Sequence, residues 1–152
     1  MPLAHDPIPS NDSKHSILSK ATSGAHPTDW DLVSSVETSV LLIGERGATG
    51  ASVNAMRPHL VAPLVHIDCR DGLDLSSVPS RGTVILLDVD ELALEDQQRL
   101  NAWLTRADPR PRVISTSRVS LVPMIDAGTF IESLYYRLNI LRFDLPSGPV
   151  ER

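Results

Sequence analysis

The sequence contains a single cysteine, Cys69, among its 152 residues. One cysteine cannot form a disulfide within the chain, and it cannot supply the several thiolates that a structural zinc or iron–sulfur site needs. We therefore expect Cys69 to pack in the interior as a small hydrophobic side chain.

Long apolar runs are also missing. No segment approaches the roughly 20 apolar residues of a membrane-spanning helix, and the first residues do not join a basic start to an apolar run, as a secretory signal does. The formal net charge of -5 gives no electrostatic reason to bind a phosphate backbone. The composition therefore predicts a cytoplasmic protein with no membrane contact and no direct DNA binding.

The beginning of the chain lacks any sustained apolar period. Residues 1–28 are rich in proline, serine, histidine and aspartate. Such a composition does not bury enough apolar surface to offset the entropy of ordering. We expect residues 1–36 to form a mostly disordered tail and residues 37–152 to form one α/β domain of ordinary size.

Short apolar runs separated by helix-like stretches dominate the rest of the sequence. Continuously apolar strands are typical of a parallel sheet that is covered on both faces. We therefore predict a mostly parallel sheet of about five strands. The candidate strands are residues 40–43, 64–67, 84–87, 113–116 and 140–143.

Two helices are predicted with some detail. The clearer one covers residues 91–105, where apolar residues share one side, although Asp96 also falls within this stripe. A second helix should begin near Ser120, carry Pro123 early and end at Gly128. In the first helix we expect an inner side of Leu92, Leu100, Trp103 and Leu104, and an outer side of Glu95, Gln98 and Asn101.

The last third of the chain has the order strand, polar turn, helix and LYYRLN segment, and reads PRVISTSRVSLVPMIDAGTFIESLYYRLNILRFDLPSGPVER. It closely resembles the end of the core AAA+ ATPase domain, the sigma-54 interaction domain, of bacterial sigma-54-dependent transcriptional activators. The resemblance covers about residues 37–152 and implies a P-loop NTPase-like three-layer sandwich. Because the chain ends at LPSGPVER, similar to the family's LPPLRER, we expect it to lack the helical lid and the DNA-binding helix-turn-helix.

The first predicted strand leads into the glycine-rich segment GERGATGAS, at the place where the family has its phosphate-binding loop. In such loops backbone N–H groups turn toward phosphates at a helix N-terminus, and the Walker A lysine adds positive charge. Gly44 and Gly47 match the family's opening, but the family's Gly-Lys step reads Gly50–Ala51 and no lysine follows Lys20.

The resemblance therefore places a vestigial nucleotide site here. The nearby cation, Arg46, is expected on the loop rather than at the helix start. The alternative is that the glycines serve the geometry of the strand-to-helix turn alone. The residues assigned to the vestigial site are Gly44, Glu45, Arg46, Gly47, Gly50, Ser52 and Asp88.

The segment GTVILLDVDEL resembles the family's Walker B region. The position of its metal-binding aspartate is Leu87 here, and the position of its glutamate is Asp88. Leucine cannot bind a hard cation, which requires oxygen ligands. A slip of one residue would make Asp88 the metal ligand, with Asp90 or Glu91 nearby. The alternative is that these three residues form a solvated acidic helix start, which the helix dipole favours.

Two further family positions are altered. The Thr-Asn sensor reads Thr116–Ser117, so Ser117 takes the sensor position without its amide. The arginine that stabilises charge in a neighbouring subunit's site is replaced by Ile131, which cannot do so. Arg137 of LYYRLN is kept, and we expect this segment to serve packing and surface support.

The internal spacing also departs from the family. Twelve residues separate Cys69 from Gly82, which leaves no room for the helix and the GAFTGA loop that grips the sigma factor. Residues 105–113 are too few for the family's second hairpin. We therefore predict no catalytic residues, no metal site and no required cofactor.

The predicted function is a protein-interaction or regulatory module in transcription. The expected partner is another protein, such as a sigma-54-dependent activator or another transcription regulator. Self-association is also expected, because an incompletely flanked sheet exposes apolar surface. The alternatives are a switch that binds ATP or ADP with Mg²⁺ without hydrolysis, an intact ATPase, and a decayed product without a selected role.

Overall fold

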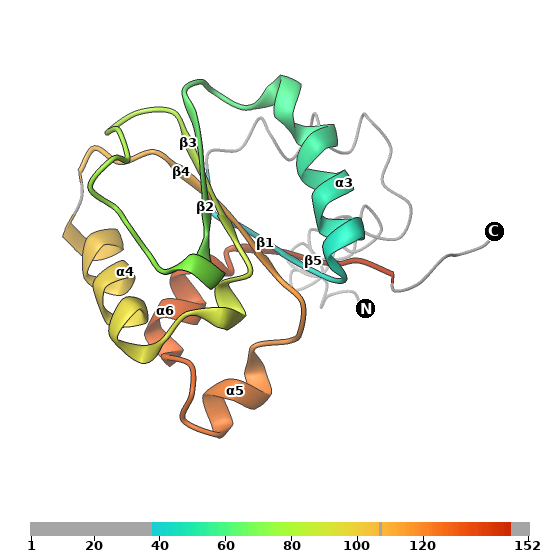
Figure 1. The fold of residues 1–152 in the computed structure, drawn as a ribbon, viewed down its shortest axis with the longest axis vertical. Coiled ribbons are helices and arrows are strands. Elements are labelled where there is room, and N and C mark those ends of the chain that lie inside the picture. The colour runs from blue at the N-terminus through green and yellow to red at the C-terminus, as the bar shows by residue number, and fades with distance from the viewer. Residues whose placement is uncertain (1–37, 107, 147–152) are drawn as a thin grey trace, which may run out of the picture.

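The computed structural model describes residues 38–106 and 108–146. Five strands form one sheet in the order β2-β3-β4-β1-β5, and every neighbouring pair is parallel. This confirms the predicted sheet (Figure 1). The predicted tail lies outside the described residues. The strands are β1 (Val40–Ile43), β2 (Leu64–Asp68), β3 (Thr83–Leu87), β4 (Arg112–Ser117) and β5 (Leu141–Asp144).

The three central strands are almost wholly buried, as expected for strands covered on both faces, although β4 ends in the buried polar residues Ser115, Thr116 and Ser117. The predicted strand bounds agree with the structure to within two residues. One end is corrected, because β5 begins at Leu141 rather than Ile140. The Leu141 N–H donates to the Ser39 carbonyl at 3.1 Å, whereas Ile140 is 55% exposed.

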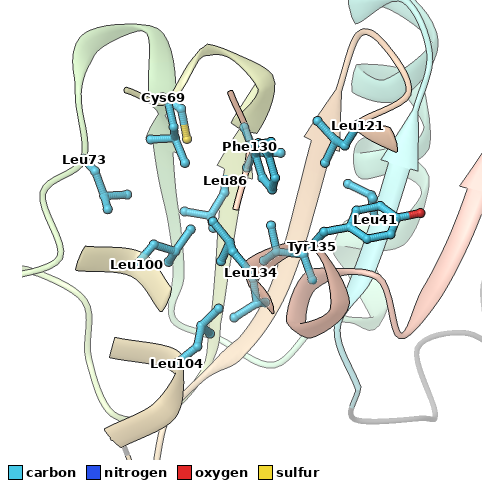
Figure 2. Close-up of a cluster of buried hydrophobic side chains, with 14 of the residues drawn as sticks. Leu41, Cys69, Leu73, Leu86, Leu100, Leu104, Leu121, Phe130, Leu134 and Tyr135 are labelled. Carbon is cyan, nitrogen blue, oxygen red and sulfur yellow. The ribbon is translucent and has the colours of Figure 1, made fainter. Parts of the chain in front are cut away.

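Helices cover the two faces of the sheet unequally (Figure 1). On one face α3 packs through Val53 and Met56 against a core that includes Phe143 of β5. The other face carries the larger core, to which α4 and α6 contribute leucines (Figure 2). The helices are α3 (Arg46–Met56), α4 (Leu94–Arg106), α5 (Val122–Asp126) and α6 (Glu132–Leu138), with short 3-10 turns at Arg57–His59, Cys69–Asp71 and Val89–Glu91.

The helix predicted over residues 91–105 begins later than expected. Val89–Glu91 is a separate 3-10 turn, and Leu92 after it is extended, so α4 starts at Leu94. The buried polar residue of its stripe is Gln97, not Asp96. Gln97 Nε2 donates to the carbonyls of Leu92 and Thr129, and Oε1 accepts from the Ile131 N–H at 2.8 Å.

The second predicted helix is confirmed apart from its start: α5 begins at Val122, and its cap residue is Leu121 rather than Ser120. Helix α5 carries Pro123 in its first turn, and Gly128 follows it with φ 81°, a conformation that favours glycine. Cys69 is buried, and this burial raises the pKa of its thiol to about 12. In the part of the chain that the structure describes, no helix has the length and apolar character to cross a bilayer.

Candidate functional site

The carboxyl ends of four strands meet at one edge of the sheet because all the strands are parallel. Ligands of open α/β sheets bind in the crevice at this edge. Gly44 follows β1, Asp68 ends β2, Asp88 follows β3 and Ser117 ends β4. Gly44 and Ser117 are neighbours, since the Gly44 N–H donates to the Ser117 carbonyl at 2.9 Å.

The connection from β1 to α3 consists only of Gly44 and Glu45. Helix α3 begins at Arg46, which corrects the expectation that Arg46 lies on the loop. The Thr49 N–H already donates to the Glu45 carbonyl at 2.9 Å, so the unbonded N–H groups of this terminus are those of the first turn. The remaining predicted phosphate-loop residues, Gly47, Gly50 and Ser52, are helical.

The glycines of this segment differ in what they do. A Cβ on Gly44 would lie 3.0 Å from the Cβ of Leu145, so a small residue is needed for this close approach. A Cβ on Gly47 or Gly50 would meet nothing within 4 Å. Packing in this structure therefore favours glycine at Gly44 but not at the other two positions.

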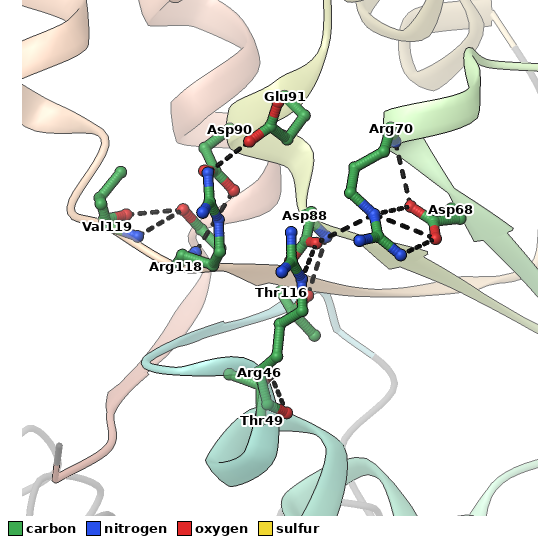
Figure 3. A network of polar contacts seen from close by, with 11 residues as sticks. Arg46, Thr49, Asp68, Arg70, Asp88, Asp90, Glu91, Thr116, Arg118 and Val119 are labelled. Carbon is green, nitrogen blue, oxygen red and sulfur yellow. Dashed lines mark hydrogen bonds and ion pairs between the residues drawn. The ribbon is translucent and has the colours of Figure 1, made fainter. Parts of the chain in front are cut away.

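Asp88 is paired with two arginines (Figure 3). Arg46 Nε donates to Asp88 Oδ2 at 2.6 Å, and Arg70 Nε lies 3.7 Å from the same oxygen. The Asp88 side chain is 5% exposed, whereas both arginine side chains are 47% exposed. The buried Asp88 carboxylate is therefore capped from the solvent side by guanidinium groups.

The backbone of Asp88 is left-handed, with φ 60° and ψ 58°. Aspartate tolerates this region better than most residues, but the conformation still costs free energy. The Asp88 N–H donates to the buried hydroxyl of Thr116 on β4 at 2.9 Å. This bond helps to fix the turn that follows β3.

Asp68 and Arg70 form a second ion pair beside Asp88. Arg70 Nη2 lies 2.6 Å from Asp68 Oδ2, and the Arg70 N–H donates to Oδ1 at 3.0 Å. The hydrogen bonds from Arg70 lower the pKa of Asp68 to about 2. Arg70 thus links the carboxylate that ends β2 to the carboxylate that follows β3.

The acidic residues after β3 do not form the solvated helix start that the sequence suggested. They lie on the 3-10 turn, and Arg118 Nη2 pairs with Asp90 at 3.3 Å and with Glu91. The Asp90 side chain is only 4% exposed. In the described part of the chain, no group of three or more His, Cys, Asp or Glu side chains is arranged to hold a metal ion.

The Ser117 hydroxyl is committed to a local turn. It donates to the Val119 carbonyl at 2.6 Å and accepts from the Val119 N–H at 3.3 Å, and Ser117 is fully buried. The hydroxyl of Ser117, the residue at the sensor position, therefore points into its own turn.

The structure brings Gly44, Arg46, Asp88 and Ser117 to one edge of the sheet, while Glu45 is an exposed cap residue without a side-chain cap bond. Sequence reasoning missed Asp68, Arg70 and Arg118, and it named Thr116 only as the first residue of the sensor pair. Asp68 and Thr116 could have been found, because both were at or next to predicted strand ends. The ion pairs that Arg70 and Arg118 form with carboxylates could not have been predicted, because the positions of the strands do not specify the directions of these side chains.

Comparisons with known proteins identify related sequences and similar folds. The sequence profile of the Sigma-54 interaction domain matches residues 27–147. The HTH-type transcriptional regulatory protein TyrR from Citrobacter braakii is 34% identical over 76 residues, which cover 43% of this chain and 15% of TyrR. The chain thus spans a small part of that relative.

Solved structures show the same fold. NtrX from Brucella abortus in complex with ADP has a TM-score of 0.64 and 18% identity, over 95% of this chain and 38% of NtrX. The P-loop NTPase domain of the sigma-54 transport activator from E. coli has a TM-score of 0.56 and 16% identity, over 95% of this chain and 99% of that domain. These likenesses confirm the predicted P-loop NTPase-like α/β fold.

Proposed function

This chain belongs to the Sigma-54 interaction domain family, and from that premise we propose that it is a regulatory relative of the sigma-54 activator ATPase core that does not hydrolyse ATP. We further propose that it acts by binding another protein in transcription. The observation that carries the proposal is the ion pair between Arg46 and Asp88 at 2.6 Å.

Arg46 is already bonded to the Asp88 carboxylate, which is the group that a metal-bound nucleotide would need. Mg²⁺ is held in phosphoryl-transfer sites by a few carboxylates together with the phosphates. Asp88 is nearly buried and faces Arg46 and Arg70, so a cation there would have to displace one guanidinium and repel the other. Leu87, at the family's metal-ligand position, offers no oxygen.

The positive charge that a triphosphate requires is also poorly placed. The residue that caps α3 is Glu45, whose carboxylate opposes an anion at this helix end. Arg46 is the first helical residue but is engaged with Asp88. The helix terminus therefore presents N–H groups beside an acidic side chain, without a lysine to offset it.

The remaining catalytic positions support the same proposal. The Ser117 hydroxyl is bonded within its own turn. Ile131, at the position of the transition-state arginine, packs at the edge of the larger core, and its N–H is bonded to Gln97. Neither residue supplies charge to a phosphoryl group in transfer.

The partner surface we propose differs from that of the active relatives. Between the turn at Cys69–Asp71 and β3 the chain has no helix and no long hairpin. The resemblance assigns contact with the sigma factor to an insertion at this place. We therefore propose that this chain contacts a sigma-54-dependent activator or another transcription regulator, rather than the sigma factor through a GAFTGA loop.

A reconstituted assay tests this proposal. The protein would be added at increasing concentration to a purified sigma-54-dependent activator from the same organism, and ATP hydrolysis by the activator would be measured. We expect the protein alone to release no phosphate and to change the activator's rate in a saturable way. Phosphate release by the protein alone, or an unchanged rate with every such activator of the host, would contradict the proposal.

A second candidate is a switch that binds ATP or ADP with Mg²⁺ without hydrolysis. The structures of NtrX with ADP and with ATP favour it, because the same fold holds nucleotides there. In this case nucleotide should raise the melting temperature, and Gly47→Leu with Gly50→Leu should abolish the shift. A shift that these substitutions leave unchanged would argue against a site at the start of α3.

A further inference from the structure

A cleft of about 1060 Å³ lies at the amino ends of the strands, at the opposite end of the sheet from Asp88. Ser39 precedes β1, Arg112 begins β4 and Ile140 precedes β5, and all three line the cleft. Its other walls come from α6 and from the connection between α4 and β4. Its volume is close to the upper limit of typical ligand pockets, roughly 1,000 Å³.

Two exposed arginines of this cleft have no carboxylate partner. Arg110 donates to the Leu104 carbonyl at 2.9 Å, and Arg137 donates to Asn101 Oδ1 at 3.0 Å. Among residues 38–106 and 108–146, neither arginine forms an ion pair, although Asp108 lines the same cleft. A guanidinium group has five N–H donors, so each arginine keeps donors for a ligand.

The same two bonds hold the guanidinium groups of Arg110 and Arg137 before a ligand arrives. Ordering a long side chain at an interface costs free energy, and a side chain that is already held avoids part of this cost. A guanidinium group can bind a carboxylate through two parallel hydrogen bonds. Both arginines are therefore suited to recognising carboxylates.

Large apolar side chains lie in the same cleft. Tyr136 is 60% exposed and Ile140 is 55% exposed. The Tyr136 ring makes an edge contact with the buried Tyr135, with 5.4 Å between the ring centroids, so this exposed aromatic is supported from behind. Tyrosine and arginine are enriched among the residues that carry most of the binding energy at protein interfaces.

The chemistry of the cleft favours one class of occupant. The chain as a whole carries a formal net charge of -5, which opposes binding along a phosphate backbone. Local positive charge beside exposed apolar side chains is complementary to an acidic segment of a protein that also carries an apolar side chain.

We propose that this cleft binds a segment of a partner protein with at least two carboxylates beside an aromatic or large aliphatic side chain. The carboxylates pair with Arg110 and Arg137, and the apolar side chain packs against Tyr136 and Ile140. The inference rests on the proposed function, for which it names the docking surface and the chemistry of the partner.

Selection of short random peptides displayed on phage tests this proposal. The full-length chain and its Arg110→Glu, Arg137→Glu variant would be screened in parallel, and fluorescence anisotropy would measure the affinity of each selected peptide. We expect the unchanged chain to select acidic peptides with an aromatic or aliphatic side chain. The double variant should bind them at least about tenfold more weakly, because attraction becomes repulsion. Lysine in place of the peptide carboxylates should restore binding to the variant.

Arg57→Glu with Arg81→Glu is the matched control, since both arginines are exposed and neither lines the cleft. If circular dichroism shows that the first glutamate pair unfolds the domain, Arg110→Gln with Arg137→Gln replaces it. The proposal is overturned if no acidic peptide is selected or if the selected peptides bind the double variant equally well. A dimer in sedimentation that the double variant dissociates would assign the cleft to a second copy of the chain, and this also overturns the proposal.

The activator assay separates a failure of this inference from a failure of the proposed function. The Arg110→Glu, Arg137→Glu variant should lose the effect on ATP hydrolysis by the activator, while the control variant keeps it. An effect that the cleft variant retains would overturn the cleft as the docking surface. If the unchanged chain affects no activator, the proposed function fails, and the peptide selection still decides what the cleft binds.

Discussion

The Thr116 hydroxyl accepts the backbone N–H of Asp88 at 2.9 Å, across the ends of two neighbouring strands. Both residues are buried. Thr116→Val keeps the shape but leaves this N–H without a partner, so we expect a loss of about 1–3 kcal/mol in the free energy of unfolding. Urea denaturation measures it. Thr116→Ser keeps the hydroxyl and is the control, and equal losses in the two variants would contradict this role.

Gln97 should be the most sensitive polar residue of α4. It is fully buried and makes three hydrogen bonds to the backbone of residues 92, 129 and 131. Gln97→Leu leaves one N–H and two carbonyls unpaired, for which we expect a loss of roughly 2–5 kcal/mol. The adjacent exposed Gln98→Leu should stay within about 0.5 kcal/mol of the unchanged chain. Similar urea midpoints for both variants would show that the Gln97 bonds are unimportant.

The glycines are predicted to respond to alanine with opposite signs. Gly50 lies inside α3 with open space around its Cβ position, so Gly50→Ala should stabilise the protein by about 0.5–1 kcal/mol. At Gly82, where φ is 99°, a Cβ would lie 2.3 Å from the Pro63 carbonyl oxygen. Gly82→Ala should therefore lower the melting temperature. A stability loss in Gly50→Ala would indicate that its backbone is needed in another conformation.

The ion pair of Asp68 predicts a defined dependence on pH. Hydrogen bonds from Arg70 lower the pKa of Asp68 from 3.8 to about 2 in the folded chain. The folded state therefore binds this proton less readily than the unfolded state, and the resulting stabilisation is present above pH 3.8 and lost as the pH falls toward 2. Urea denaturation at a series of pH values should show a shallower decline over this range for Asp68→Asn. Parallel curves for the two proteins would contradict the assignment.

The sheet was predictable because β1 and β3 are buried and almost continuously apolar, whereas β2 and β5 are only partly buried. The helix starts were less predictable. Asp88 adopts a left-handed backbone, which ends β3 and opens a 3-10 turn, so α4 begins three residues later than its apolar period suggests. Gln97 lies on the same side of α4 as Leu100 and Leu104 and is buried with them. The sequence does not show which backbone groups will bond to its amide, so its burial was not predicted.

The site was predictable in position but not in its contacts. The resemblance assigned Gly44, Asp88 and Ser117 to one site, and the parallel strands bring them to one edge of the sheet. The glycine spacing suggested a loop, whereas the structure has a helix from Arg46 onward. Arg46 and Asp88 are 42 residues apart, and their contact depends on the packing of α3 against the sheet, which sequence patterns do not give.

Calorimetric titration of the full-length protein with Mg²⁺ and ATP, repeated with ADP, tests the central claim most directly. Because Arg46 and Arg70 hold the Asp88 carboxylate, we predict no saturable heat at nucleotide concentrations of about 1 mM, where an affinity of about -4 kcal/mol would already be detected. Saturable binding of one nucleotide per chain, weakened by Asp88→Asn, would contradict the account and show that the arginines give way to a metal-bound nucleotide.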